Sequence, residues 1–237
     1  MPAAVLEDND VNKTKVKRMM AFDIEQARYN MVEQQIRTWE VLDERVLDLL
    51  FHVRREEFVP REYRTLAFAD VEIPLSGNAR MWTPKMEARV LQELTLKATD
   101  RVLEIGTGSG YFSALLASQA AEVESIEIDR RLAGDASAKL ARHEFRNVRV
   151  IEGDGARGYG NDMYDVIVLT GSTPLLPERF FEQLKPAGRL FAVVGETPVM
   201  EARLVRQTSR DARVSVDLFE TVIAPLVNAA TPARFQF

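Results

Sequence analysis

Val102-Leu103-Glu104-Ile105-Gly106-Thr107-Gly108-Ser109-Gly110 is the stretch that decides the fold. A short apolar run leads into three glycines at alternate positions, and a helix-compatible segment follows at Tyr111. Glycines at such a point allow a tight turn and let a ligand approach the backbone closely. The stretch therefore predicts a strand, a ligand-binding loop and a helix, which is the building unit of nucleotide-binding α/β domains.

Short β-rich runs alternate with helical stretches on the C-terminal side of this loop. This alternation predicts a parallel, doubly wound sheet. Two further strands joined by a polar turn predict an antiparallel ending. The predicted fold class is therefore α/β, with a doubly wound, mostly parallel seven-stranded sheet, an antiparallel C-terminal strand pair and added N-terminal helices. The predicted strands are 101–105, 123–128, 148–152, 164–170, 189–195, 201–207 and 214–224, and the helices between the first five are 110–121, 130–143 and 176–184.

Three segments make up what we expect to be a single compact domain of 237 residues. Residues 1–20 are polar and mixed in charge, which predicts a disordered extension. Residues 21–99 contain periodic apolar positions and one long irregular loop, and they predict helices that begin near Asp23, at Asp43 as N-cap, and at Pro84. Residues 100–237 form the predicted ligand-binding core.

The composition excludes several function classes. The net charge of -5, from 31 basic and 36 acidic residues, disfavours non-specific binding to nucleic acid or anionic membranes. The chain has no cysteine, which excludes disulfides and thiolate sites and fits a cytoplasmic protein. No apolar run approaches the about 20 residues needed to cross a bilayer. With His52 and His143 as its two histidines, the chain predicts no metal site, and neither histidine is expected to be catalytic: His52 is read as structural and His143 as a helix-end surface residue.

The glycine spacing separates the ligands that such a loop can take. A dinucleotide loop usually reads G-x-G-x-x-G, because the pyrophosphate must reach the helix N-terminus. Here Gly106, Gly108 and Gly110 read G-x-G-x-G behind the acid Glu104. S-adenosylmethionine has no phosphate, and its methionine end carries an ammonium that suits an acid at the start of the loop. The predicted ligand is S-adenosylmethionine, with S-adenosylhomocysteine as the product.

Acids at two further strand ends strengthen this prediction. Glu127 ends the next strand, 17 residues after Gly110, where a carboxylate can accept both hydrogen bonds of a ribose diol. Asp154 follows the strand after that and can accept from the adenine amino group. The alternative is that Glu127 and Asp129 only cap the following helix and that Gly153-Asp154-Gly155 is an ordinary turn. The predicted cofactor-binding residues are Glu104, Gly106, Thr107, Gly108, Ser109, Gly110, Glu127, Ile128, Asp154 and Gly155.

Several stretches together resemble one family. Besides the glycine loop, they are Met31-Val32-Glu33-Gln34-Gln35-Ile36-Arg37, Phe58-Val59-Pro60, Tyr164-Asp165-Val166-Ile167, Gln183-Leu184-Lys185-Pro186 and Val222-Ile223-Ala224-Pro225-Leu226. From about Arg28 to Leu226 the chain resembles the protein-L-isoaspartate O-methyltransferase family. The resemblance implies a Rossmann-like class I methyltransferase core with a rearranged final strand pair. It also implies esterification of isoaspartyl carboxylates in damaged proteins, with Val222–Leu226 as the closing strand.

The loop before Pro84 departs from the family. The family's Gly-x-Gly-Gln-Thr-Ile-Ser-x-Pro aligns with residues 76–84, and its active-site serine falls on Trp82. The predicted substrate-binding residues are Arg80, whose guanidinium can pair with a carboxylate, Trp82, and Thr83, whose hydroxyl is one residue away. The alternatives are a solvated surface arginine and a tryptophan that only packs under the loop. No catalytic residue is assigned.

Three functions remain open at this point. The first is isoaspartyl carboxyl methylation, which needs no general base because the acceptor is already ionised. The second keeps the cofactor but methylates another acceptor, such as a small molecule. The third is an S-adenosylmethionine-binding protein without transfer activity. A methyl-transfer assay on an isoaspartyl peptide separates the first from the others, and calorimetric titration of the cofactor tests the premise that all three share.

Overall fold

Residues 24–209 and 212–232 are described by a computed structural model, and they form a seven-stranded sheet flanked by helices. The strand order is β5-β4-β3-β6-β7-β8-β9, with parallel pairing from β5 to β7 and antiparallel pairing from β7 to β9. The predicted α/β fold with an antiparallel ending is confirmed, while the predicted extension over 1–20 lies outside the described residues. The strands are β3 (Arg101–Ile105), β4 (Glu122–Glu127), β5 (Val148–Glu152), β6 (Tyr164–Leu169), β7 (Leu184–Glu196), β8 (Val199–Gln207) and β9 (Arg213–Glu220).

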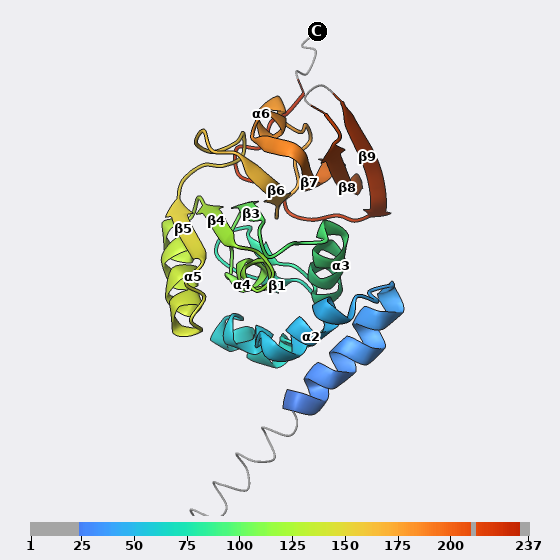
Figure 1. Cartoon of the computed structure of the whole chain (residues 1–237). Coiled ribbons are helices and arrows are strands. Elements are labelled where there is room, and N and C mark those ends of the chain that lie inside the picture. Colours follow the sequence, from blue (N-terminus) through green and yellow to red (C-terminus); the bar gives the residue numbers. More distant parts are fainter. Residues whose placement is uncertain (1–23, 210–211, 233–237) are drawn as a thin grey trace, which may run out of the picture.

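The helices begin at the residues that their capping chemistry indicates. The Asp43 side chain accepts the N–H of Arg45 and caps α2, and Thr83 caps α3 ahead of Pro84. In Figure 1 the N-terminal helix and α2 gather at one side of the molecule, β7 to β9 lie at the other, and α3 lies between them. No helix in the described ranges has the length and apolarity to cross a membrane. The helices are α2 (Glu44–His52), α3 (Pro84–Leu94), α4 (Tyr111–Ala117), α5 (Arg130–Arg142) and α6 (Glu178–Glu182). The α-helical residues 24–30 continue into a π-helix over Met31–Ile36 and a 3-10 helix over Arg37–Trp39.

Side chains of β3 alternate between two apolar cores, one on each face of the sheet. Val102 belongs to the core that also holds the helices α3 and α4, whereas Leu103 and Ile105 belong to the core under α6. Each fully buried aliphatic side chain of this kind contributes about 1.5–3 kcal/mol. Because successive side chains of a strand point to opposite faces, Glu104 shares its face with Val102 and turns toward the helical layer.

The segment between α2 and α3 carries the loop that departs from the family. It runs through the 3-10 turns η3 (Arg55–Glu57) and η4 (Arg61–Leu66) and then forms a short hairpin of β1 (Ile73–Pro74) and β2 (Arg80–Met81). In this hairpin Ile73 pairs with Met81. Arg131, at the start of α5, donates to the Ser76 hydroxyl at 3.1 Å, and this contact links the hairpin loop to α5.

The end of the chain differs from its sequence-based prediction. The last strand stops at Glu220, although the apolar pattern predicted it to continue to residue 224. Residues 221–228 instead turn back over the sheet edge. Ser172 donates its N–H to the Ala224 carbonyl at 3.0 Å, and its own carbonyl accepts the N–H of Leu226 at 2.9 Å. We call residues 221–228 the C-terminal strap.

Candidate functional site

A cavity of about 270 Å³ lies at the carboxyl ends of β3, β4 and β5. Its walls are the glycine loop after β3, the hairpin loop between β1 and β2, and the C-terminal strap. Ligands of doubly wound sheets bind at this edge. Ten of the residues predicted to bind cofactor or substrate line the cavity, and they are Gly106, Thr107, Gly108, Ser109, Glu127, Ile128, Asp154, Gly155, Arg80 and Trp82.

The glycine loop approaches the end of β6 so closely that a side chain at position 106 does not fit. Gly106 has a φ of +98°, and a Cβ built on it would lie 2.2 Å from the Thr170 hydroxyl oxygen. That hydroxyl in turn lies 2.6 Å from the Gly106 carbonyl oxygen. Only glycine combines this backbone conformation with this approach, so the loop holds its shape as a ligand cradle.

The carboxylate of Glu127 lies at the cavity and can accept further hydrogen bonds. Its Oε2 accepts the N–H of Gly108 at 2.8 Å, and its Oε1 accepts the N–H of Asp129 at 3.0 Å. A carboxylate has about four lone-pair sites, so two remain for ligand hydroxyls. The capping role is taken by Asp129, which accepts from Arg131 and Leu132 at the start of α5. The helix-cap alternative therefore describes Asp129, whereas Glu127 does not cap α5.

The structure places the side chain of Glu104 behind the cavity wall. Its side chain is fully buried on the helical face and does not line the cavity. Oε2 accepts from the hydroxyls of Ser113 and Ser125, and burial raises the pKa of this carboxyl to about 8. Burial therefore favours the protonated form of this carboxyl. Its effect on the cavity is indirect, because the Ser125 hydroxyl lies 2.6 Å from that of Thr107, which lines the wall.

Asp154 is joined to the C-terminal strap. Its Oδ1 accepts the N–H of Ala156 at 3.0 Å, and its Oδ2 accepts from the Asn228 side chain at 2.9 Å. Residues 223–227 of the strap line the cavity on the same side. The sequence predicted a closing strand here, because the apolar run 222–226 resembles a strand. It did not predict this wall, because no local pattern indicates that the run packs against Ser172.

Two other predicted site residues, Gly110 and Thr83, make structural contacts. Gly110 begins α4 with a φ of +84°, and a Cβ there would lie 3.1 Å from the Ala136 side chain, so this glycine lets α4 pack on α5. The Thr83 hydroxyl accepts the N–H of Met86 at 3.4 Å as the cap of α3. Neither residue lines the cavity.

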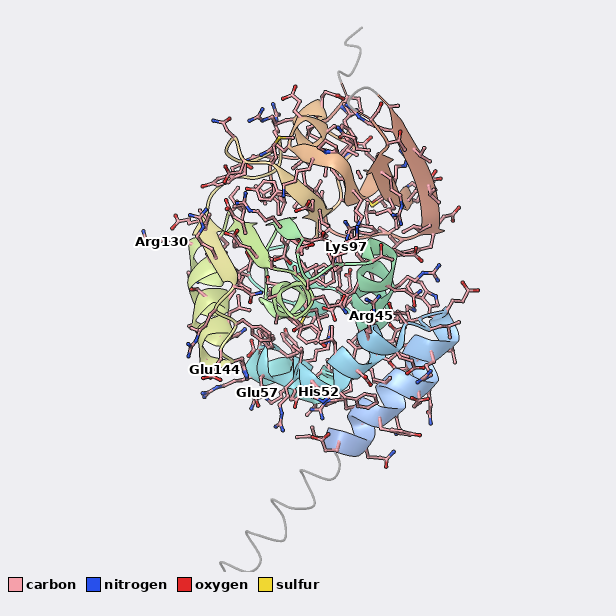
Figure 2. All side chains as sticks on the ribbon, viewed as in Figure 1. Arg45, His52, Glu57, Lys97, Arg130 and Glu144 are labelled. Atoms are coloured by element: carbon pink, nitrogen blue, oxygen red, sulfur yellow. The ribbon has the colours of Figure 1, made fainter. Side chains whose placement is uncertain are left out.

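The two histidines lie away from the cavity wall. His52 is exposed at the end of α2, where its Nδ1 lies 2.7 Å from the Asp48 carbonyl oxygen, and Figure 2 shows it at the outer edge of the molecule. His143 is not the simple surface residue that the sequence predicted. Its ring stacks on Phe58 with centroids 5.2 Å apart, and its Nε2 is buried. No group on the described cavity wall is therefore an imidazole base.

A buried ion pair, which the sequence did not reveal, supports the wall formed by the divergent loop. Arg55 donates from Nε to Glu87 Oε2 at 2.9 Å, and both side chains are almost fully buried. Glu87 lines the cavity, and burial raises its pKa to about 7. Arg80, at the mouth, lies 3.9 Å from Glu72, whose pKa burial also raises. Sequence spacing gave no sign of the Arg55–Glu87 pair, because 32 residues separate its members.

The lining of the cavity is acidic. Among its described residues Arg80 is the one basic side chain, against five acids. A cavity lined by one sign of charge favours ligands of the other sign. This arrangement suits a sulfonium or an ammonium and disfavours the pyrophosphate of a dinucleotide. The five acids are Glu72, Glu87, Glu127, Asp129 and Asp154.

Comparisons with known proteins agree with this geometry. Residues 26–231 match the family profile described as Protein-L-isoaspartate(D-aspartate) O-methyltransferase. The chain is 38% identical over 202 residues to a protein-L-isoaspartate O-methyltransferase of Methanoculleus marisnigri, covering 84% of this chain and 91% of the relative. It is 34% identical over 220 residues to the enzyme of that name from Koribacter versatilis, covering 91% and 97%.

A solved structure shows the same fold. It is a Plasmodium falciparum chain described as a beta-aspartate methyltransferase and crystallised with S-adenosyl-L-homocysteine. The two superpose with a TM-score of 0.73 at 18% identity, over 86% of this chain and 97% of the other. The shared fold thus covers most of both chains.

Proposed function

The chain belongs to the protein-L-isoaspartate(D-aspartate) O-methyltransferase family, and from this premise we propose that it methylates the isoaspartyl carboxylate of damaged proteins with S-adenosylmethionine. One observation carries the proposal. Glu127 and Asp154, at the ends of neighbouring strands, line one cavity with the glycine loop, and that cavity is acidic. This is the arrangement that a ribose, an adenine and a cationic methyl donor require together.

The residues present fit the methyl donor, which supplies an electrophilic methyl group when bound. The loop from Gly106 to Ser109 would hold the methionine portion, because its glycines leave no side chain between backbone and ligand. Glu127 would accept the ribose hydroxyls through its spare lone pairs, and Asp154 would accept from the adenine amino group. Ile128 and Gly155 line the cavity beside these two acids.

The protein's own contribution to the reaction is positioning. The carboxylate acceptor has a reference pKa near 4, so it is ionised at neutral pH and no residue has to remove a proton. The attacking oxygen must lie about 3–3.5 Å from the methyl carbon and opposite its leaving group. Trp82, Phe112 and Ile223 supply apolar wall that excludes water from this region. Arg80 at the mouth can pair with a carboxylate of the substrate.

A direct assay tests the proposal. The protein is incubated with methyl-labelled S-adenosylmethionine and one of two synthetic peptides that differ only in an isoaspartyl or a normal aspartyl residue. We expect label in the isoaspartyl peptide alone, as an ester that releases methanol on mild base treatment. Calorimetric titration with S-adenosylhomocysteine checks the cofactor site separately. Binding without label in the isoaspartyl peptide would contradict the acceptor, and failure to bind would contradict the whole proposal.

The remaining inferences concern where the protein works and what it meets. The partner that the proposal names is a damaged protein or peptide with an accessible isoaspartyl residue. A cytoplasmic location, and the absence of nucleic-acid and membrane binding, stay predictions from the composition of the chain.

A further inference from the structure

The side chain of Trp82 combines three properties. It lines the cavity, only 4% of the residue is exposed, and its ring packs against Phe112 and Phe191 with centroids 5.2 and 6.0 Å apart. Its Nε1 is buried and has no acceptor among the described residues. A buried donor left unpaired costs about 1–3 kcal/mol, and most buried polar groups in native structures have a partner. An indole N–H can only donate, so the missing partner is an acceptor atom.

The backbone of Trp82 is fixed by Arg55. The Nη2 of this guanidinium donates to the Trp82 carbonyl at 2.5 Å, and its Nη1 donates to the Ala67 carbonyl at 2.8 Å. Its Nε pairs with Glu87 on the first turn of α3, as described above. The hydrogen bonds of this planar guanidinium thus connect η3 with the end of η4 and with the junction of β2 and α3. The ring of Trp82 therefore has a defined place in the wall.

Three other side chains near Trp82 are engaged, half-exposed or acidic. The Thr83 hydroxyl caps α3 and does not line the cavity. Arg80 is about half exposed at the mouth and has Glu72 as its neighbour. Glu87 is a buried acid, and its charge would repel a carboxylate if Arg55 did not compensate it. Among the described residues that line the cavity, Trp82 has a buried N–H without an acceptor.

We propose that Trp82 donates its indole N–H to an oxygen of the methyl-accepting carboxylate, and that Arg55 positions the ring for this contact. The inference rests on the proposed function, because it takes the acceptor to be a carboxylate. To the proposed function it adds the atom that binds the acceptor, Trp82 Nε1, and a positioning residue outside the cavity, Arg55. In this arrangement the aromatic ring of Trp82 excludes water, and its N–H orients the attacking oxygen.

Nuclear magnetic resonance observes this N–H directly. The chain contains two tryptophans, Trp39 and Trp82, so a protein labelled with ¹⁵N-tryptophan gives two indole signals. The signal that disappears in Trp82→Phe is that of Trp82. With S-adenosylhomocysteine bound, addition of the isoaspartyl peptide is expected to move this signal downfield and to leave that of Trp39 in place. The aspartyl peptide is expected to move neither.

Kinetics of matched variants test the same contact. Trp82→Phe keeps an aromatic ring and removes the N–H, so kcat/KM for the isoaspartyl peptide should fall about 10- to 100-fold, as for a lost hydrogen bond to a charged group. The Kd for S-adenosylhomocysteine should not change. The control is Trp39→Phe, at a half-buried ring that packs on Phe219 of β9, and it should keep wild-type kinetics.

Arg55→Lys tests the positioning role. Lysine keeps the charge beside Glu87 but cannot donate to Trp82 and Ala67 as the fork does. We expect KM for the peptide to rise more than kcat falls, and the Trp82 indole signal to shift even without peptide. If this variant does not fold, Trp82→Phe still decides the donor role. The positioning role is then decided in folded Arg55→His, where the peptide should no longer move the Trp82 signal downfield.

Each outcome supports or overturns a defined statement. A wild-type protein that methylates the peptide while the Trp82 signal stays in place overturns the donor role alone. Wild-type kinetics in Trp82→Phe does the same. An unchanged Trp82 signal in a folded Arg55 variant overturns the positioning role. A wild-type protein that does not methylate the isoaspartyl peptide overturns the proposed function, and this inference falls with it.

Discussion

The amide N–H of Gly108 lies 2.8 Å from Oε2 of Glu127, so the loop after β3 and the acid that ends β4 are joined by a direct hydrogen bond. This contact orients the carboxylate toward the cavity while Asp129 holds its other oxygen. A carboxylate held in this way loses little further freedom when a ligand binds, and such preorganisation favours affinity. The glycine loop and Glu127, the acid that we propose to bind the ribose, therefore act as one unit.

Glu127→Gln should weaken S-adenosylmethionine binding about 10- to 100-fold, because hydrogen bonds from the ribose to a charged acceptor are lost. Calorimetric titration gives the change in Kd. The matched control is Glu122→Gln at the start of the same strand, where the side chain pairs with Arg101 at 3.0 Å outside the cavity. Equal loss of affinity in both variants would show that general charge, and not the ribose contact, sets the affinity.

Gly106→Ala should reduce cofactor affinity by about tenfold or more, because an L-residue at a φ of +98° is strained and its Cβ meets the Thr170 hydroxyl. The same substitution at Gly134, within α5 and with no neighbour within 4 Å, should stabilise the protein by about 0.5–1 kcal/mol. Calorimetry and urea unfolding measure the two effects. Unchanged affinity in Gly106→Ala would contradict the cradle.

Glu104 should make the stability of the protein depend on pH. Burial raises its pKa from 4.5 to about 8, so between these values the native state holds a proton that the unfolded state has released. The stabilisation from this proton is fully present below pH 4.5 and is lost as the pH rises to about 8, with a slope of at most about 1.4 kcal/mol per pH unit. Urea unfolding at several pH values should show this fall in wild type and a flatter profile in Glu104→Gln. Parallel profiles would contradict the raised pKa.

Asn228→Ala should speed the release of S-adenosylhomocysteine about three- to tenfold, because the strap loses its hydrogen bond to Asp154, a contact worth about 1 kcal/mol. Stopped-flow displacement measures the dissociation rate. Asn161→Ala serves as control, since Asn161 accepts from Arg179 outside the cavity. A rate that does not change would mean that the strap does not retain the ligand.

The sequence predicts the sheet and the acidic strand ends well, because both depend on local patterns. Alternating strands and helices give the order of the core, and carboxyl ends of parallel strands meet at one edge, which brings Glu127 and Asp154 to the same cavity. The direction in which the Glu104 side chain points also follows from a local pattern. The two-residue period of β3 puts its side chain on the face of Val102, beside Ser113, and not at the strand end.

Local sequence patterns do not indicate contacts between segments that lie far apart in the chain. Arg55 meets Glu87 and Trp82 across about 30 residues, and Asn228 meets Asp154 across 74. Arginine and glutamate in a polar turn or on a helix are usually solvated, so their burial is set by packing that no single segment specifies. The contacts around Trp82 and the course of the strap are therefore seen only in the structure. The acids at the strand ends, in contrast, could be predicted from the sequence.

The strap also sets the order in which the site is completed during synthesis. Residues 223–228 follow the last strand of the sheet, yet they supply a wall of the cavity and a partner for Asp154. A nascent chain leaves the ribosome from its N-terminal end, so the glycine loop and both strand-end acids emerge before the segment that covers them. The ligand edge thus stays uncovered until all seven strands have been made, and only a chain translated through residue 228 encloses its ligand.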